Sequence, residues 1–382
     1  MSLDDPPPSA LIAMTPLAVT VGDALAEGRR IMSICNACRY CEGYCAVFPA
    51  LERRLEFSDS DLRYLANLCH NCGACLTSCQ YAPPHEFALN LPRNFAEIRV
   101  QSYRRFAWPG FAASLYGGGL GRTLLLTIVA VAIFLYFTID RVPSVPSSFY
   151  DVIPHRVMAT AFGAVGVFIV LALGAMFARF WRDGGEGAAK AFDLRAVASA
   201  THDALTLRYL GGGGEGCAGG DGPPSTARRW FHHATAYGFG LCFAATVVAT
   251  WYHYVLHWPA PYPVTSFPVL LGIVGGIGLV VGPAGLWWLA RRRDPALGDP
   301  RQAGPNSSFI ALLFLTSVSG LALLAFRAYP AMPHLLAIHL GIVMALFVTI
   351  PYGKFVHAVY RVGALLRYAI ERRRPVITGD AG

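Results

Sequence analysis

CNACRYCEGYC occupies residues 35–45 of the 382-residue chain, and CHNCGACLTSC occupies residues 69–79. Both stretches have the spacing C-x2-C-x2-C-x3-C, which is the spacing of bacterial ligands for two [4Fe–4S] clusters. In such pairs the fourth cysteine of each run binds the cluster of the other run. The sequence therefore predicts two clusters, with Cys35, Cys38, Cys41 and Cys79 holding one and Cys69, Cys72, Cys75 and Cys45 holding the other.

Disulfides and zinc are the alternatives for these cysteines. An even number of regularly spaced cysteines also occurs in bridged, secreted scaffolds. Here Asp4 and Asp5 stand where a secretory signal would be basic, so a reducing, cytoplasmic setting is expected. Structural zinc sites usually pair two C-x2-C units rather than place four cysteines in each run. Iron–sulfur ligation is therefore the preferred interpretation.

Composition indicates a membrane protein. Hydrophobic residues make up 54% of the chain and charged residues only 14%, whereas soluble domains carry about 25% charged residues. The net charge of +8 does not point to nucleic acid, because the basic residues flank apolar segments. Six segments approach the ~20 residues needed to span a bilayer. They are 121–139, 157–180, 231–256, 267–290, 308–326 and 334–357.

The charges of the connecting loops predict an orientation. Lysine and arginine gather in the loop 181–230, after the fourth segment and after the sixth, whereas the loop 257–266 has neither residue. Because basic loops stay in the cytoplasm, both termini and the cysteine runs are expected there.

The predicted fold is mainly α, with a cytoplasmic two-cluster ferredoxin-like domain fused to a six-helix transmembrane bundle. A short helix should join the cysteine runs, with Ser58 or Ser60 as its N-cap and Leu62, Leu65 and Leu68 facing inward. Residues 86–120 mix arginines with aromatic residues, as an interfacial segment or an ordinary linker would. The expected divisions are 1–25 flexible tail, 26–85 ferredoxin-type domain, 86–120 interfacial linker, 121–360 haem-binding bundle and 361–382 cytoplasmic tail.

Histidines mark the third and sixth apolar segments. Histidine is costly inside a bilayer and is therefore a candidate functional group there. Histidines at both ends of two facing helices suit bis-histidine binding of one or two b-type haems. Histidines that only reach the interface are the alternative. The preferred ligands are His232, His253, His339 and His357, with His233 and His257 as alternates.

The pairing of these histidines follows from the directions of the two segments. His232 should face His357 at the inner ends, and His253 should face His339 at the outer ends. His339 and His357 are 18 positions apart, which on one helix of about 3.6 residues per turn places them on one face. The other histidines show no partner in the sequence; they are His70, His85, His155 and His202, with His334 at the start of the sixth segment.

GGGGEGCAGG at residues 211–220 does not follow a strand or open a helix, as a dinucleotide-binding motif would. We expect a flexible loop, with docking of a soluble partner as the alternative. Cys217 and Cys242 belong to neither cysteine run. Since no other flavin or NAD(P) motif is present, the electron donor should be a separate protein or a dissociable molecule.

Four further stretches, with the cysteine runs, carry a family resemblance. They are TLRYLGGGGEGC (206–217), HHATAYGFGLCFAAT (232–246), YHYVLHWPAPYP (252–263) and HLGIVMALFVTIPYGKFVHAVYR (339–361). Over roughly residues 26–370 the chain resembles the tricarballylate/citrate utilisation protein B family. The resemblance implies a six-helix inner-membrane protein with two [4Fe–4S] clusters and haem b.

The resemblance also implies a partner. This would be a cytoplasmic, FAD-dependent, TcuA-like dehydrogenase that oxidises tricarballylate to cis-aconitate. The chain would reoxidise the partner's reduced flavin and pass the electrons to membrane quinone, acting as an electron-transfer component rather than a self-contained catalyst. The alternatives are the membrane anchor of another quinone-linked respiratory complex, of heterodisulfide or succinate type, and a redox sensor.

Overall fold

The computed structural model describes residues 21–116, 119–139, 148–185, 193–214, 216–217 and 224–374. Of the tails expected at 1–25 and 361–382, residues 1–20 and 375–382 lie outside these ranges, and residues 21–25 form the start of helix α1 (Val21–Cys38). Within them the protein is helical, and its one β-type pairing is an isolated bridge between Cys217 and Ser225. The prediction of a mainly α fold is confirmed.

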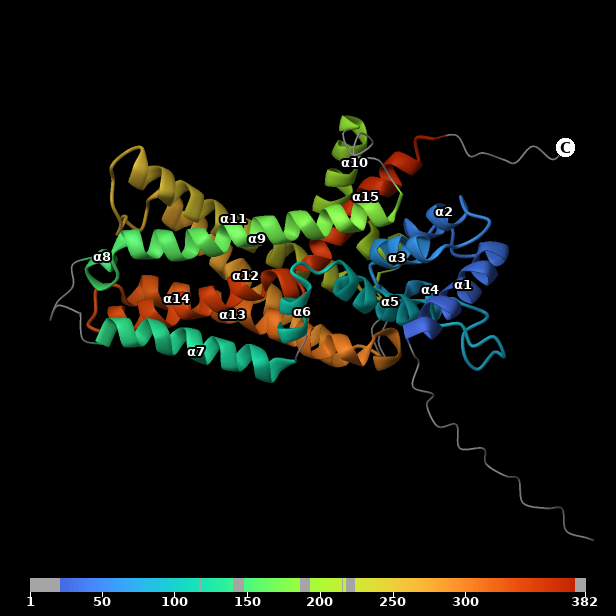
Figure 1. The fold of residues 1–382 in the computed structure, drawn as a ribbon, viewed down its shortest axis with the longest axis horizontal. Helices are drawn as coiled ribbons and strands as arrows, with labels where there is room; N and C mark the ends of the chain where they lie inside the picture. The colour runs from blue at the N-terminus through green and yellow to red at the C-terminus, as the bar shows by residue number, and fades with distance from the viewer. Residues whose placement is uncertain are drawn as a thin grey trace, which may run out of the picture.

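The cysteine-containing helices gather at one end of the molecule (Figure 1). The core that they share includes Met32, Leu65 and Ile98, which are fully buried. The predicted short helix is present as α3. Its N-cap is Ser58, whose hydroxyl accepts from the backbone N–H of Asp61 while the Asp61 carboxylate accepts from the Ser58 N–H. The bounds are α1 Val21–Cys38, α2 Val47–Leu51, α3 Asp59–Leu68, α4 Ala74–Thr77 and α5 Leu91–Phe106.

Helix α5 corrects the expected boundary at residue 85. Residues 91–106 of the region assigned to a linker form this helix, which packs against α1 and α3. Its apolar residues recur at helical spacing, and Phe95 and Ile98 are completely buried in the core of the cysteine-containing domain. The mixture of arginines and rings thus reflects a helix with one buried face. The domain extends to about residue 106, and α6 (Gly110–Tyr116) follows it.

Six helices are long and apolar enough to cross a membrane, as predicted. They run beside one another away from the cysteine-containing end (Figure 1). Small residues bring α11 and α12 close together, because a Cβ added at Gly238 would lie 2.8 Å from the carbonyl oxygen of Gly275. The chain is a multi-pass membrane protein. The bounds are α7 Leu120–Ile139, α9 His155–Asp183, α11 Ala227–Tyr254, α12 Phe267–Arg292, α13 Ala303–Phe326 and α14 Met332–Thr349.

The sixth segment differs from the prediction. Helix α14 ends at Thr349, a 3-10 turn (η5) covers Ile350–Tyr352, and α15 begins at Val356 and ends at Glu371. Pro351 explains the break, since proline lacks an N–H and disfavours helix at the residue before it. His339 and His357 therefore lie on different helices, and the one-helix geometry expected for them is wrong.

Helix α15 also replaces part of the expected tail at 361–382. It packs against α3, α9 and the short helix α10 (Leu194–Leu205). Tyr360, Ala364 and Leu365 on this helix are completely buried. Residues 361–371 therefore belong to the core that the cysteine-containing domain shares with the membrane helices.

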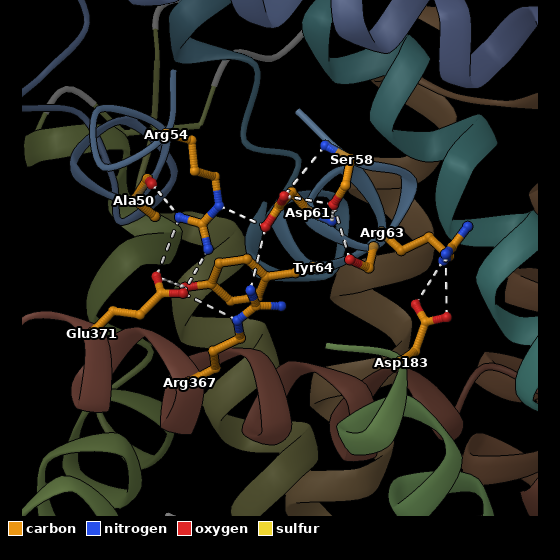
Figure 2. A network of polar contacts seen from close by, with 10 residues as sticks. Ala50, Arg54, Ser58, Asp61, Arg63, Tyr64, Asp183, Arg367 and Glu371 are labelled. Atoms are coloured by element: carbon orange, nitrogen blue, oxygen red, sulfur yellow. Dashed lines mark hydrogen bonds and ion pairs between the residues drawn. The ribbon is translucent and has the colours of Figure 1, made fainter. Parts of the chain in front are cut away.

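Ionic contacts fasten the cysteine-containing domain to α15 and α9, as Figure 2 shows. The Glu371 carboxylate accepts from Arg54 at 2.5 Å, from Arg367 at 3.0 Å and from the Tyr64 hydroxyl at 3.1 Å. Asp61 accepts from Arg54 at 2.7 Å. These groups are mostly buried, so the contact is more than a surface ion pair.

A second contact of the same kind reaches α9. Arg63 of α3 donates to the carboxylate of Asp183, at the end of α9, with an Nε–Oδ2 distance of 2.8 Å (Figure 2). Both side chains are mostly buried. The cysteine-containing domain is therefore tied to two helices of the membrane domain.

Candidate functional site

The first group of thiols combines both cysteine runs. Cys35, Cys38 and Cys41 line a cavity of about 340 Å³ together with Cys75 and Cys79 from the second run. Burial and the neighbouring thiols of Cys79, Cys41 and Cys38 raise the pKa of Cys35 to about 12. Burial and the thiols of Cys79 and Cys38 raise the pKa of Cys41 to about 11. We call Cys35, Cys38, Cys41 and Cys79 the first thiol group; Cys75, which the sequence assigns to the other cluster, borders the same cavity.

The second thiol group is the complementary set. Burial is the main cause that raises the pKa of Cys45 well above its ordinary value, followed by the thiols of Cys69 and Cys72. Burial likewise raises the pKa of Cys75, followed by the thiols of Cys69, Cys45, Cys72 and Cys41. Each fourth cysteine therefore lies with the other run, which is the arrangement of a two-cluster protein.

The thiols of the first group line a cavity. Among the described residues, which include all ten cysteines, no three His, Cys, Asp or Glu side chains are placed to hold a single metal ion. Structural zinc needs four ligands, with thiolates at about 2.3 Å from one ion. The donor set of eight thiols and the cavity beside Cys35 fit [4Fe–4S] clusters better than zinc.

The glycine-rich segment covers the second thiol group. Residues Arg208–Gly214 form 3-10 turns, η2, with a kink at Gly212 and Gly213, and residues 215 and 218–220 of the expected flexible loop lie outside the described residues. A Cβ added at Gly212 would lie 2.9 Å from the Cβ of Ala74 and 3.7 Å from the sulfur of Cys72. Gly212 has a φ of +55°, which glycine adopts readily. The sequence shows the glycines but gives no sign of what they touch.

Four arginines bind the loop that carries Cys69. Two donate to the carbonyl oxygen of Cys69, and two donate to that of Asn71 at 2.7–2.8 Å. They come from α5, α11, the end of α12 and α15, so they hold the second thiol group against the membrane domain. These residues, which sequence reasoning missed, are Arg99 and Arg361 on Cys69 and Arg228 and Arg293 on Asn71.

His232 and His357 lie together beside this loop. Their ring centres are 6.1 Å apart and their planes are inclined by 79°. His357 Nδ1 lies 2.5 Å from the carbonyl oxygen of Lys354, so this nitrogen is the donor and Nε2 is left for a ligand. These two imidazoles are a donor set that would hold a haem iron.

His70 lies between the second thiol group and the histidine pair. Burial, and then the charges of Arg361 and Arg228, lower its pKa well below the ordinary value, and His232 is close enough to contribute. His70 is therefore a neutral ring beside a cysteine of one candidate centre and a histidine of the next. No partner for His70 was predicted from the sequence.

The outer histidines are arranged differently from the predicted pairing. The ring of His253 stacks on that of His155, with centres 3.9 Å apart. His339 Nδ1 lies 3.0 Å from the hydroxyl of Ser319. His155 is thus a partner that the sequence did not reveal. His233, the alternate for His232, stacks on Tyr237 instead. The inner pair fits one haem, and ligation by the outer histidines stays a prediction.

Comparison with known proteins covers nearly the whole chain. A family model described as citrate utilization protein B matches residues 115–378, and one described as the Fer4-like domain of citrate utilization protein B matches residues 28–105. A curated protein of Escherichia coli described as citrate utilization protein B is 51% identical over 363 residues, which are 94% of this chain and 95% of the relative. No solved structure matches the chain.

Proposed function

The chain belongs to the citrate utilization protein B family, and from this premise we propose that it reoxidises a partner flavoprotein dehydrogenase and delivers the electrons to membrane quinone. The electrons would pass through two [4Fe–4S] clusters and haem b. The partner would be a cytoplasmic, FAD-dependent, tricarballylate dehydrogenase-like protein. The chain itself makes and breaks no substrate bonds in this proposal, because its cofactors carry the chemistry.

The order of the candidate centres is the observation that carries this proposal. The first thiol group lines a cavity that also includes Tyr40, whose side chain is exposed. The second thiol group is covered by Gly212 and joined to the membrane domain by arginines. His70 and the pair His232–His357 follow it. A donor in water would reach the first group, and electrons would leave from the second.

The surface around the first thiol group suits a protein donor. Tyr81 lines the same cavity, and its ring contacts that of Phe87, which is partly exposed like Tyr40. Exposed rings are frequent in the central part of protein interfaces. We place the docking site of the flavoprotein here, at the end of the molecule farthest from the membrane helices (Figure 1).

Each set of residues has a separate task in this proposal. The eight cysteines hold the clusters, which would carry one electron at a time at potentials set by hydrogen bonds, charge and exposure. Gly212 allows η2 to approach the second cluster site and keep water from it. His232 and His357 hold the haem iron, and the carbonyl of Lys354 fixes the tautomer of His357.

The proposed orientation places the cysteine-containing domain and both termini in the cytoplasm. Arg291 and Arg292 end α12 at the cysteine-containing side, and Arg182 ends α9 there. The loop 257–266 at the opposite side has no lysine or arginine. This distribution follows the positive-inside rule for a protein of the inner membrane.

Analysis of the purified chain tests the proposal. We expect about eight cluster irons per chain, a matching amount of acid-labile sulfide, a Soret band, and low-temperature EPR signals after reduction. Cys72→Ser should lower the iron content, whereas Cys242→Ser, in the middle of α11, should not. A chain without a Soret band, or without EPR signals of reduced clusters, would falsify the proposed relay.

A further inference from the structure

Five cationic side chains meet between the second thiol group and the His232–His357 pair. They come from α5, α11, the residue after α12, the turn before α15 and α15 itself. Their charges act on one another, since four of them lower the pKa of the fifth. We call them the cation group: Arg99, Arg228, Arg293, Lys354 and Arg361.

The cation group has no carboxylate partner among the described residues. Arg99 is buried, and the other four side chains are half-buried. Elsewhere at the same interface the buried arginines are paired, as Arg54 is with Glu371. Cations that are largely removed from water without a counter-ion are costly, so an anion is expected between them.

Hydrogen-bond donors of the cation group remain available for such an anion. Each arginine uses one terminal nitrogen on a backbone carbonyl of the Ala66–Asn71 segment. The Nε of Arg361 is buried without a partner. In the described part of the chain, the ammonium of Lys354 likewise has no hydrogen bond or ion pair. These donors suit carboxylate or phosphate oxygens.

We propose that the cation group binds the two propionate carboxylates of the haem held by His232 and His357. This inference rests on the proposed function, since it needs that haem. Lys354 lies three residues before His357 and accepts a hydrogen bond from its ring. Arg228 lies four residues before His232, which is one helical turn. The cations thus surround the histidine pair, and two carboxylates on one edge of a haem would neutralise part of their charge.

A phosphate headgroup or a free dicarboxylate carries anionic oxygens like those of the haem propionates, so the test is designed to distinguish these sources. The full chain, produced without haem and purified in detergent, is titrated with protohaem and with its dimethyl ester, whose propionates carry no charge. Lys354→Met should weaken protohaem binding about tenfold or more, as loss of a charge-assisted hydrogen bond does. Binding of the ester should change less than about twofold.

Two variants serve as controls in the same titrations. Lys354→Arg, which keeps the charge, should bind protohaem nearly as the wild type does. Arg179→Gln should change neither titration, because Arg179 also donates to a backbone carbonyl, that of Ala107, but lies outside the cation group. Arg293→Gln is the second test variant and should behave like Lys354→Met. Cluster iron is measured for every variant to verify its fold.

The outcomes separate this proposal from the proposed function. The propionate site would be overturned if Lys354→Met and Arg293→Gln weakened the binding of protohaem and of its dimethyl ester equally, or weakened neither. Equal weakening would point to a lipid or free anion instead. A wild-type chain that binds no haem, or a His357→Ala variant that binds it unchanged, would refute the proposed haem site itself.

Discussion

Glu371→Gln should release the cysteine-containing domain from α15. The Glu371 carboxylate is buried and holds Arg54, Arg367 and the hydroxyl of Tyr64 (Figure 2). Glutamine keeps the shape and one acceptor but removes the negative charge. Asp61 is then the one carboxylate that these two arginines share among the described residues.

The size of the effect follows from the burial of this network. The side chains of Arg54 and Glu371 are each only 10% exposed. Removing one partner of a buried ion pair costs about 3–5 kcal/mol, and we take about 3 kcal/mol because glutamine still accepts a hydrogen bond. A domain of this size loses about 4–8 °C in Tm for each kcal/mol. The unfolding midpoint of the domain should therefore fall by roughly 12–24 °C.

The assay follows the cluster absorbance of the full chain in detergent as it is heated. Glu27→Gln is the matched control, because Glu27 pairs with Arg30 on the surface of the same domain and both side chains are about 40% exposed. That pair should contribute less than about 1 kcal/mol. If Glu371→Gln and Glu27→Gln lower the midpoint equally, the network does not hold the domain as argued.

Four further predictions concern the centres and their supports. Cys79→Ser should abolish the same EPR signal as Cys38→Ser, and Cys45→Ser should abolish the same signal as Cys72→Ser. If Cys79→Ser instead abolished the signal that Cys72→Ser abolishes, the assignment of each fourth cysteine to the other run's cluster would be wrong. Gly212→Ala should cost roughly 2–4 kcal/mol through its φ of +55° and its contact with Ala74, and should speed cluster loss in air. Gly211→Ala, which meets nothing within 4 Å, should not. The pKa of Asp61 lies below its ordinary 3.8 because hydrogen bonds and charges from Ser58, Arg54 and Arg367 outweigh its burial. Its contribution to stability should therefore be full above that value and lost as pH falls through the lower folded pKa, and Asp61→Asn should flatten this part of the Tm–pH curve. His232→Ala should lose the inner haem, whereas His253→Ala and His339→Ala should keep it, as judged by haem per chain; equal loss in all three would place the haem elsewhere.

Features set by local chemistry were predictable from the sequence. The spacing of the cysteine runs predicted that thiols of the two runs lie together, and Cys35 is indeed beside Cys79 and Cys75 beside Cys45. Ser58 followed by Asp61 specified the start of α3, because a cap needs only neighbouring residues. The six spans followed from hydropathy and length. None of these inferences required knowledge of what lies across the molecule.

Features set by tertiary contact were not predictable in the same way. The apolar stripe of Phe95 and Ile98 on α5 suits a membrane surface and a protein core equally well. Its burial against α1 and α3 could therefore not be predicted from the spacing of apolar residues alone. The contact of Gly212 with Cys72 and Ala74 joins segments far apart in the chain. The stacking of His155 on His253 does the same. By contrast, Pro351 indicates in the sequence that α14 ends there, but the continuous apolar stretch 334–357 led to the prediction of one unbroken helix.

The break at Pro351 explains how one segment can serve both the membrane and the cysteine-containing domain. On a continuous helix, His357 would lie about 27 Å along the axis from His339, at 1.5 Å per residue. Instead the chain turns at Gly353, and α15 brings Lys354 and His357 to the inner histidine site. The same helix carries Arg361 to the Cys69 carbonyl and Glu371 to Arg54. The spacing between the second thiol group and the His232–His357 pair therefore depends on one helix that contacts both.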